Sequence, residues 1–265
     1  MRIALGVEYA GDAFEGWQSQ PHGRTVQDHL ERAIGAVAGH AVRLHCAGRT
    51  DTGVHATAQV AHFDTSARRP DTAWVRGVNS HLDDLPVTVR WAVEVGEDFH
   101  ARYSATARRY RYVLHDHPTR PALLARRVGW FHLPLDEAAM AEAAIHLVGE
   151  HDFTAFRAAG CQARTPVRRL YEARVQRDGA YLTFDFHANG FLHHMVRNLV
   201  GALVTVGKGA QPPEWIAGLL AARDRSLAAP TFPPHGLYLC GVDYPAGWPL
   251  PGEGRIIVLP RLPLP

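Results

Sequence analysis

The chain has 265 residues, of which 46% are hydrophobic and 20% charged, and its formal net charge is +2. This is the composition of a globular protein with one large or two smaller domains, and it argues against a disordered or fibrous chain. No apolar run reaches the ~20 residues of a membrane-spanning helix, and Glu8 interrupts the N-terminal apolar run too early for a signal peptide, so we expect a cytoplasmic protein without a membrane partner.

The first half of the chain alternates predicted strands with one well-marked helix. Thr25 can cap this helix with Asp28 three residues on, and Gly39 can end it. Its apolar stripe consists of Val26, Leu30, Ala33, Ile34 and Val37. Apolar alternation predicts strands at residues 3–9, 42–47, 58–64 and 87–95.

A second cycle of strands and helices follows. Asp136 can cap a helix that carries Met140, Ala144, Leu147 and Val148. Residues 192–206 are apolar on most faces, as in a buried helix, and Pro213 can begin a short helix. Strands are predicted at 110–114, at 237–242, and at 173–176 and 181–187, which form a hairpin around Asp178-Gly179.

Two such cycles predict the α+β class, with two similar α/β halves that contain antiparallel or mixed sheets. We place the halves at residues 1–104 and 105–245. The remaining tail, residues 246–265, holds five prolines, and we expect it to be an extended arm.

Arginine dominates the positive charge, since Lys208 is the only lysine. A genome rich in G and C would produce the same bias, but it does not explain clustering. Residues 101–130 hold seven arginines against one acid, Asp116, and residues 151–177 hold six against two. Arginine forks suit phosphate groups and stack on bases, so these clusters predict a nucleic-acid partner.

The sequence gives no support for metal, disulfide or cofactor chemistry. Cys46, Cys161 and Cys240 are far apart and form no CxxC, which fits a reducing compartment. The 17 histidines contain no HExxH, and His193 and His194 would point ~100° apart on a helix, too far to share a metal ion. Neither a dinucleotide fingerprint nor a P-loop is present, so we predict no metal and no cofactor.

The strongest chemical signal is the loop Gly48-Arg49-Thr50-Asp51-Thr52-Gly53 between two predicted strands. Its glycines allow a bulky ligand to come close, and Arg49 would keep Asp51 ionised, as a nucleophile requires. A turn aspartate that bonds its own backbone explains the same spacing. Asp51-Thr52-Gly53 is also the Asp-Thr-Gly of aspartic proteases, although Arg49 opposes the shared proton which that mechanism needs.

Several motifs in a fixed order resemble those of the tRNA pseudouridine synthase A family. They are Tyr9-Ala10-Gly11 with Phe14-Glu15-Gly16-Trp17-Gln18, Thr25-Val26-Gln27, the Asp51 loop continued to Ala56, Phe99-His100-Ala101-Arg102-Tyr103-Ser104-Ala105 with Arg109-Tyr110-Arg111-Tyr112, His151-Asp152-Phe153, Cys161-Gln162-Ala163-Arg164-Thr165, Phe191-Leu192-His193-His194-Met195-Val196-Arg197-Asn198, and Gly236-Leu237-Tyr238-Leu239. The resemblance covers residues 3–244. Thr52 and Tyr103 stand where the family commonly has alanine and phenylalanine.

The resemblance implies a pseudouridine synthase fold, whose two halves join around a central cleft. By position, Asp51 would be the catalytic aspartate, Tyr110 the tyrosine that packs on the target uracil, and Arg197 the arginine that pairs with the aspartate. Arg49 would act in base flipping and RNA contact. Further tRNA contacts would come from Arg68 or Arg69, from Phe99, His100, Ala101, Arg102 and Tyr103, and from Gly160, Cys161, Gln162, Ala163 and Arg164.

Two of these residues can also be interpreted without the family. Tyr110 in a strand could be a core aromatic residue. Arg197 lies on an otherwise apolar helix, where an unpaired guanidinium would be costly, so it needs an acidic partner, and Asp51 is the natural candidate.

The resemblance further implies an isomerase that converts uridines 38, 39 and 40 of the tRNA anticodon arm to pseudouridine. It also implies a homodimer with tRNA lying across both subunits. Asp51 could attack uracil C6, attack C1′, or remove a ribose proton. The alternatives are a non-catalytic RNA-binding protein, a dimeric aspartic protease, and a metal-dependent RNA hydrolase.

Overall fold

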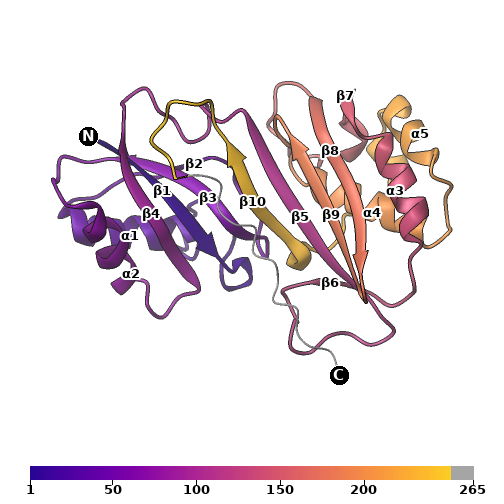
Figure 1. Cartoon of the computed structure of the whole chain (residues 1–265), viewed down its shortest axis with the longest axis horizontal. Helices are drawn as coiled ribbons and strands as arrows, with labels where there is room; N and C mark the ends of the chain where they lie inside the picture. The colour runs from indigo at the N-terminus through magenta and orange to yellow at the C-terminus, as the bar shows by residue number, and fades with distance from the viewer. Residues whose placement is uncertain (252–265) are drawn as a thin grey trace. The chain divides into compact units, whose positions relative to one another are not determined.

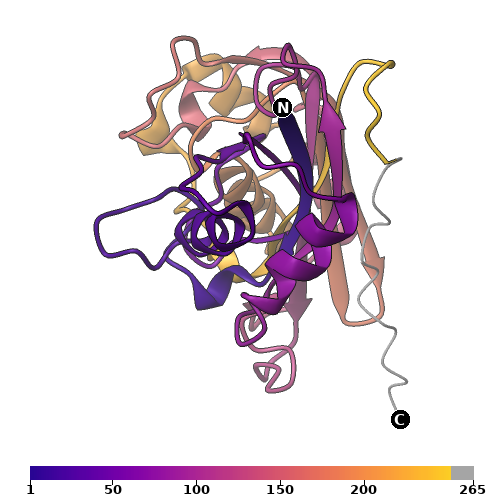
Figure 2. The same ribbon diagram turned by 90° about the vertical axis from the view of Figure 1, so that its left-hand side faces the viewer.

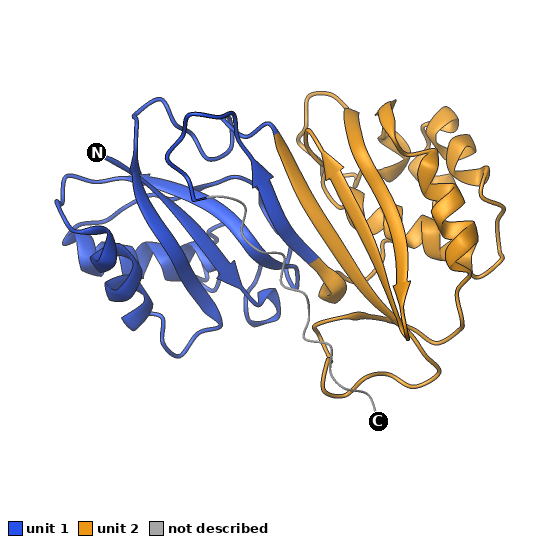
Figure 3. Cartoon of the chain, in the orientation of Figure 1, with its two compact units in different colours: residues 1–106, 238–265 blue, residues 107–237 orange. Residues whose placement is uncertain are grey.

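The computed structural model describes residues 1–251, which form two compact units. Unit 1 comprises Met1–Thr106 and the described residues from Tyr238 onward, and unit 2 comprises Ala107–Leu237 (Figure 3). The first boundary lies close to the predicted one at residue 104. The predicted second half, 105–245, differs from unit 2, because the last strand of the chain pairs with a strand of unit 1.

Unit 1 is built on a mixed sheet with the strand order β4-β1-β3-β10 and the short β2 paired to β3 (Figure 1). Its strands are β1 (Arg2–Tyr9), β2 (His45–Cys46), β3 (His55–Asp64), β4 (Val87–Val95) and β10 (Leu237–Asp243). β1 runs antiparallel to β3 and β4, whereas β10 runs parallel to β3. The strand predicted at 42–47 is shorter than expected, since β2 has only two residues.

The helices and turns of unit 1 are η1 (Gly11–Ala13), α1 (Val26–Ala38), the π-helical turn η2 (Ala73–Gly77) and α2 (Val78–Ser80). The predicted ends of α1 are confirmed. Thr25 and Asp28 form a reciprocal capping box, and Gly39 ends the helix in the left-handed conformation at φ 78. Figure 2 shows α1 on one face of the unit-1 strands and the segment after β10 on the other.

The second face of the unit-1 sheet has an apolar layer of its own. Ala4 and Phe99 belong to a buried cluster there, and Trp248 and Leu250 pack against it. The first residues of the predicted tail are therefore part of this packing rather than a free arm. Residues 252–265 lie outside the described residues.

Unit 2 is built on the strand order β5-β9-β8-β7, with β6 paired to β5. Its strands are β5 (Ala107–Asp116), β6 (Gly129–Phe131), β7 (Gly149–Asp152), β8 (Val167–Asp178) and β9 (Tyr181–Ala188). β5, β9, β8 and β7 pair antiparallel, and β6 runs parallel to β5. The predicted hairpin at Asp178-Gly179 is confirmed, but the sequence predicts neither β6 nor β7, which are too short for a clear alternation.

The helices and 3-10 turns of unit 2 are α3 (Glu137–Ile145), η3 (Thr154–Phe156), α4 (Met195–Gly207), α5 (Trp215–Ala222), η4 (Arg225–Leu227) and η5 (Pro234–Gly236). Asp136 caps α3 as predicted, with its side chain accepting from the Ala139 N–H. α4 is buried along most of its length, as predicted. The mixed α+β class is confirmed in both units, and no helix within residues 1–251 has the length and apolar character to cross a membrane.

Candidate active site

The loop that carries Asp51 joins β2 to β3 in unit 1. Asp51 is half-buried, whereas Arg49 is exposed. The Val54 N–H donates to the Asp51 carbonyl at 3.1 Å, and the Trp17 N–H donates to the Thr50 carbonyl at 2.9 Å. The backbone on both sides of Asp51 is therefore fixed by hydrogen bonds.

Gly11 packs closely against the backbone at the end of this loop. A Cβ atom at Gly11 would lie 1.9 Å from the Val54 carbonyl oxygen, so only glycine fits. The Gly11 carbonyl accepts from Gly53 at 3.2 Å, and the Gly11 N–H donates to Nδ1 of His55 at 3.0 Å. That bond requires an unprotonated Nδ1, so neutral His55 carries its proton on Nε2. The buried His55 ring also stacks on Tyr238 of β10 at 4.7 Å.

A buried polar network supports the same loop, and the sequence does not predict it. The side-chain amide of the fully buried Gln59 donates to the Gly48 carbonyl at 2.7 Å and accepts from the Gly48 N–H at 3.4 Å. The hydroxyls of Tyr9 and Thr50 are hydrogen-bonded at 2.7 Å. Because a buried polar group without a partner costs free energy, these bonds favour one conformation of the loop. The only signal in the sequence is a glutamine beside the apolar residues Ala58, Val60 and Ala61.

The other two predicted catalytic side chains lie in unit 2. Tyr110, on β5, is 9% exposed, and its ring meets Phe191 edge-on with centroids 5.1 Å apart. Arg197 lies in the first turn of α4, where its Nε donates to the Phe232 carbonyl at 2.8 Å and so fixes the guanidinium plane. The predicted pairing of Arg197 with Asp51 joins residues of different units, and it stays a prediction.

The two histidines before α4 differ from the sequence prediction. His194 adopts the left-handed conformation at φ 59, and α4 begins only at the next residue, Met195. The rings of His193 and His194 lie 4.0 Å apart between centroids. The prediction that a helix separates these two rings is therefore wrong, because neither histidine is inside the helix.

In the first predicted tRNA-contacting segment, 99–103, a hydrogen bond fixes the backbone, and two side chains are exposed. Phe99 and Ala101 are fully buried, and the Ala101 N–H donates to Nδ1 of His62 at 3.1 Å. Tyr103 is 76% exposed, and the Arg102 guanidinium lies 5.7 Å from its ring centroid. Arg102 and Tyr103 are thus the side chains that this segment presents to solvent.

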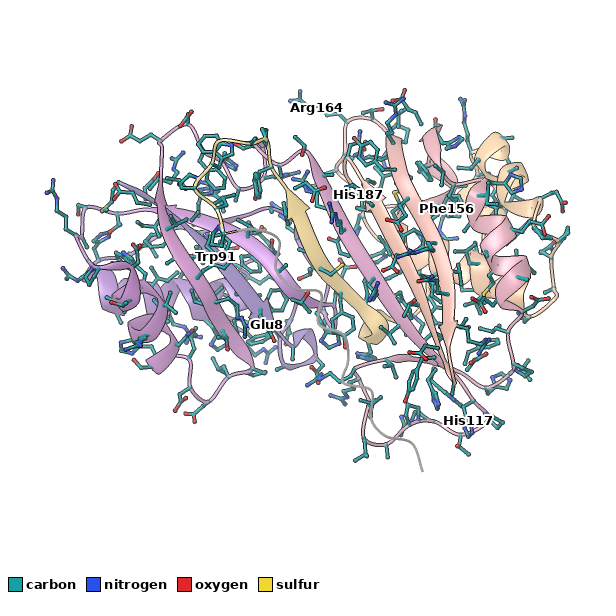
Figure 4. All side chains as sticks on the ribbon, viewed as in Figure 1. Glu8, Trp91, His117, Phe156, Arg164 and His187 are labelled. Atoms are coloured by element: carbon teal, nitrogen blue, oxygen red, sulfur yellow. The ribbon has the colours of Figure 1, made fainter. Side chains whose placement is uncertain are left out.

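The second predicted segment, 160–164, is tethered by Arg157. The Arg157 guanidinium donates to the carbonyls of Cys161 at 2.6 Å and Ala163 at 3.0 Å. Figure 4 shows Arg164 projecting away from the strands of unit 2. The exposed residues among the remaining predicted contacts are Arg68, Arg69, Gly160, Gln162 and Arg164.

Comparison with known proteins identifies relatives that span the chain. A family profile described as tRNA pseudouridine synthase matches residues 6–104 and 143–245. A protein of Aromatoleum aromaticum named tRNA pseudouridine synthase A is 72% identical over 263 residues, which is 99% of each chain. Proteins of the same name from Dechloromonas aromatica and Thiobacillus denitrificans are 62% and 59% identical over 251 residues, which cover 95% of this chain and 95% and 96% of theirs.

Proposed function

The chain belongs to the tRNA pseudouridine synthase family, and from this premise we propose that it isomerises uridines 38, 39 and 40 in the anticodon arm of tRNA. The observation that carries the proposal is the braced loop that holds Asp51 half-buried beside an exposed Arg49. A carboxylate held in one position can act on a nucleoside without the entropy cost of ordering a mobile group.

Pseudouridine formation conserves atoms and electrons. The bond between uracil N1 and ribose C1′ breaks, a bond between C5 and C1′ forms, C5 loses a proton and N1 gains one. Such an isomerisation calls for a nucleophile or base and for charge stabilisation, and it involves no oxidant or reductant. Asp51 suits the first role, and Arg197, whose guanidinium is oriented by the Phe232 carbonyl, would take the second.

Before the chemistry, the target base must leave its stack, which costs a few kcal/mol. An exposed arginine such as Arg49 can fill the vacated space. The Tyr110 ring, held edge-on by Phe191, can receive the flipped uracil by stacking, which is worth ~1–3 kcal/mol. Arg69, the exposed residues of 99–103 and those of 160–164 would then contact phosphate and 2′-OH groups along the arm.

The proposal includes a cytoplasmic homodimer with one tRNA lying across both subunits, without metal or cofactor. The resemblance along nearly the whole chain supports the dimer. The reducing compartment is supported by Cys46, Cys161 and Cys240, which form no disulfide within residues 1–251. The absence of a redox step in the isomerisation is the reason to expect no cofactor.

The decisive experiment measures pseudouridine in unmodified tRNA after incubation with wild type and with Asp51→Asn. The amide keeps the shape of the side chain but cannot be a nucleophile or base, so product should fall to background while the Kd for tRNA stays within about twofold. Asp84→Asn, which neutralises an exposed carboxylate of unit 1, is the matched control and should keep full activity.

The same assay separates this function from its alternatives. Pseudouridine made by Asp51→Asn would contradict the assignment of Asp51. Wild type that binds tRNA but makes no pseudouridine would be a non-catalytic RNA-binding protein. Neither the protease nor the metal-dependent hydrolase has a counterpart among the relatives described above.

A further inference from the structure

The segment between β5 and β6, residues 117–128, is an exposed loop that the proposed active site does not use (Figure 1). It carries Arg120, Arg126 and Arg127, and the sequence has no acid from His117 to Leu135. Arg120 and Arg126 are exposed, and neither side chain forms an ion pair within residues 1–251. We call this segment the basic loop.

The acid nearest to the basic loop in the sequence does not neutralise it. Asp116, at the end of β5, accepts from both terminal nitrogens of Arg177 at 2.8 Å. Its side chain is only 2% exposed, so its charge is directed at Arg177. The basic loop therefore keeps a surplus of positive charge at the surface.

The base of the loop is held by hydrogen bonds. The Trp130 indole N–H donates to the His117 carbonyl at 2.8 Å, and the His117 N–H donates to the Phe131 carbonyl at 3.1 Å. At the tip, the Arg127 N–H donates to the Leu124 carbonyl at 2.9 Å, which closes a turn. A loop held at both places can present its arginines with little loss of conformational entropy on binding.

Arg126 occupies an unusual position in that turn. Its φ of 63 lies in the left-handed region, which glycine adopts without steric cost and other residues rarely do. Glycine can therefore replace Arg126 without straining the turn.

The loop also lies far along the sheet from Tyr110. Tyr110 is near the start of β5 and the loop follows its end, so seven extended residues, about 23 Å, separate Tyr110 from His117. The segment 160–164 precedes β8, whose start lies level with that of β5, because Arg108 and Leu170 both align with Ala188 of β9. Figure 4 accordingly shows His117 and Arg164 at opposite ends of unit 2.

We propose that the basic loop is a second tRNA-binding surface that holds the phosphate backbone away from the target uridine, an inference that rests on the proposed function. Arginine forks bind phosphate oxygens in pairs, and the charge surplus of the loop complements RNA. An RNA that reaches both Tyr110 and this loop must extend beyond the nucleotides around the target. The contact should therefore matter for whole tRNA and not for an isolated anticodon stem-loop.

The test compares Arg126→Gly and Arg120→Ala in the full chain. Glycine adopts the left-handed turn without strain and removes the whole side chain, guanidinium included, so a loss of binding cannot come from a strained loop. Arg223→Gly is the control for the turn and for the lost charge, because Arg223 is also an exposed arginine with positive φ, 54, and lies outside the basic loop, although it pairs with Asp152 at 3.6 Å. All three variants lose one charge.

Each basic-loop variant should raise the Kd for unmodified tRNA about three- to tenfold at ~0.1 M salt and reduce the slope of log K against log salt by about one. The Kd for the isolated stem-loop and the values for Arg223→Gly should match wild type. An unchanged Kd and slope for whole tRNA would overturn the proposal, and so would an equal loss with the stem-loop or with Arg223→Gly.

Leu123, at the tip of the basic loop, is 91% exposed and allows a test of whether the loop binds a protein instead of RNA. If Leu123→Ser changes the oligomer mass in sedimentation while the basic-loop variants keep wild-type tRNA binding, the loop is a protein contact and the proposal fails. Failure of the proposed function would look different, because wild type itself would then make no pseudouridine.

Discussion

Gly11→Ala should slow pseudouridine formation in a protein that still folds. The added Cβ would stand 1.9 Å from the carbonyl oxygen of Val54 and 2.5 Å from its carbonyl carbon, which are backbone atoms that cannot rotate away. Ordinary van der Waals contact begins at 3.4 Å, so the Val54 carbonyl must move by about 1.5 Å relative to Gly11. Because the Val54 N–H is bonded to the Asp51 carbonyl, that shift reaches Asp51.

A misplacement of about 1 Å can cost a catalytic group about 100-fold in rate. We therefore expect kcat/KM of Gly11→Ala to fall at least about 100-fold, which is about 2.7 kcal/mol of transition-state stabilisation. Overpacking of this kind costs about 1–3 kcal/mol of folding stability, less than the ~5–15 kcal/mol typical of a folded protein. Apart from Arg49, which shares the loop with Asp51, the proposed tRNA-binding side chains lie on other segments, so the Kd for tRNA should stay within about threefold of wild type.

The rate can be followed by tritium release from tRNA labelled at C5 of uridine, because the proton at C5 is lost when the C5–C1′ bond forms. Filter binding gives the Kd for tRNA, and urea unfolding gives the stability. Gly218→Ala is the control, since a Cβ at Gly218 would have nothing within 4 Å, and alanine in this helix should add ~0.5–1 kcal/mol of stability. A Gly11→Ala enzyme as fast as wild type would refute the idea that the contact between Gly11 and Val54 sets the position of Asp51.

Two further predictions concern stability. Burial, together with His100 and Arg2, lowers the pKa of His62 to about 4 from 6.5. As the pH falls, the unfolded chain therefore protonates His62 before the folded protein does. The free energy of unfolding should decrease by ~3 kcal/mol between pH 6.5 and pH 4. His62→Gln should remove this part of the pH dependence in urea titrations across that range, and an identical profile for variant and wild type would count against it. Thr25→Ala should lower the free energy of unfolding by ~1 kcal/mol, because it removes the side-chain cap of α1. Thr25→Ser keeps a capping hydroxyl and should retain most of that stability. Equal losses in the two variants would speak against capping.

Elements with local signals are the ones that the sequence predicts well. Thr25 and Gly39 mark both ends of α1, and Asp178-Gly179 marks the turn between β8 and β9, because each acts on the backbone within a few residues. The partner of β10 cannot be predicted in this way. Its parallel pairing, with Leu239 opposite Ala56, joins distant parts of the chain and depends on tertiary packing. This pairing is the reason that unit 2 ends before the predicted half does.

At the candidate site, the sequence identifies the groups with distinctive chemistry but not those that hold them in place. Asp51 stands out because it is a carboxylate in a glycine-bounded loop, two residues after an arginine. His55 and Gln59 do not stand out, because their importance comes from burial and from bonds to the backbone of Gly11 and Gly48. Such bonds form only when distant strands are brought together, so no local pattern predicts them.

Three loops with exposed arginines follow the same design, in which one side chain holds the backbone by hydrogen bonds and the charged tip stays exposed. His62 accepts the Ala101 N–H in 99–103, Arg157 donates to two carbonyls in 160–164, and Trp130 donates to the base of the basic loop. Each phosphate contact is weak by itself, so its effect on affinity depends on how little entropy is lost when it forms. The holding residues set that loss during folding, before RNA arrives. Substituting them should therefore weaken tRNA binding without removing any charge, which distinguishes a pre-organised surface from a merely basic one.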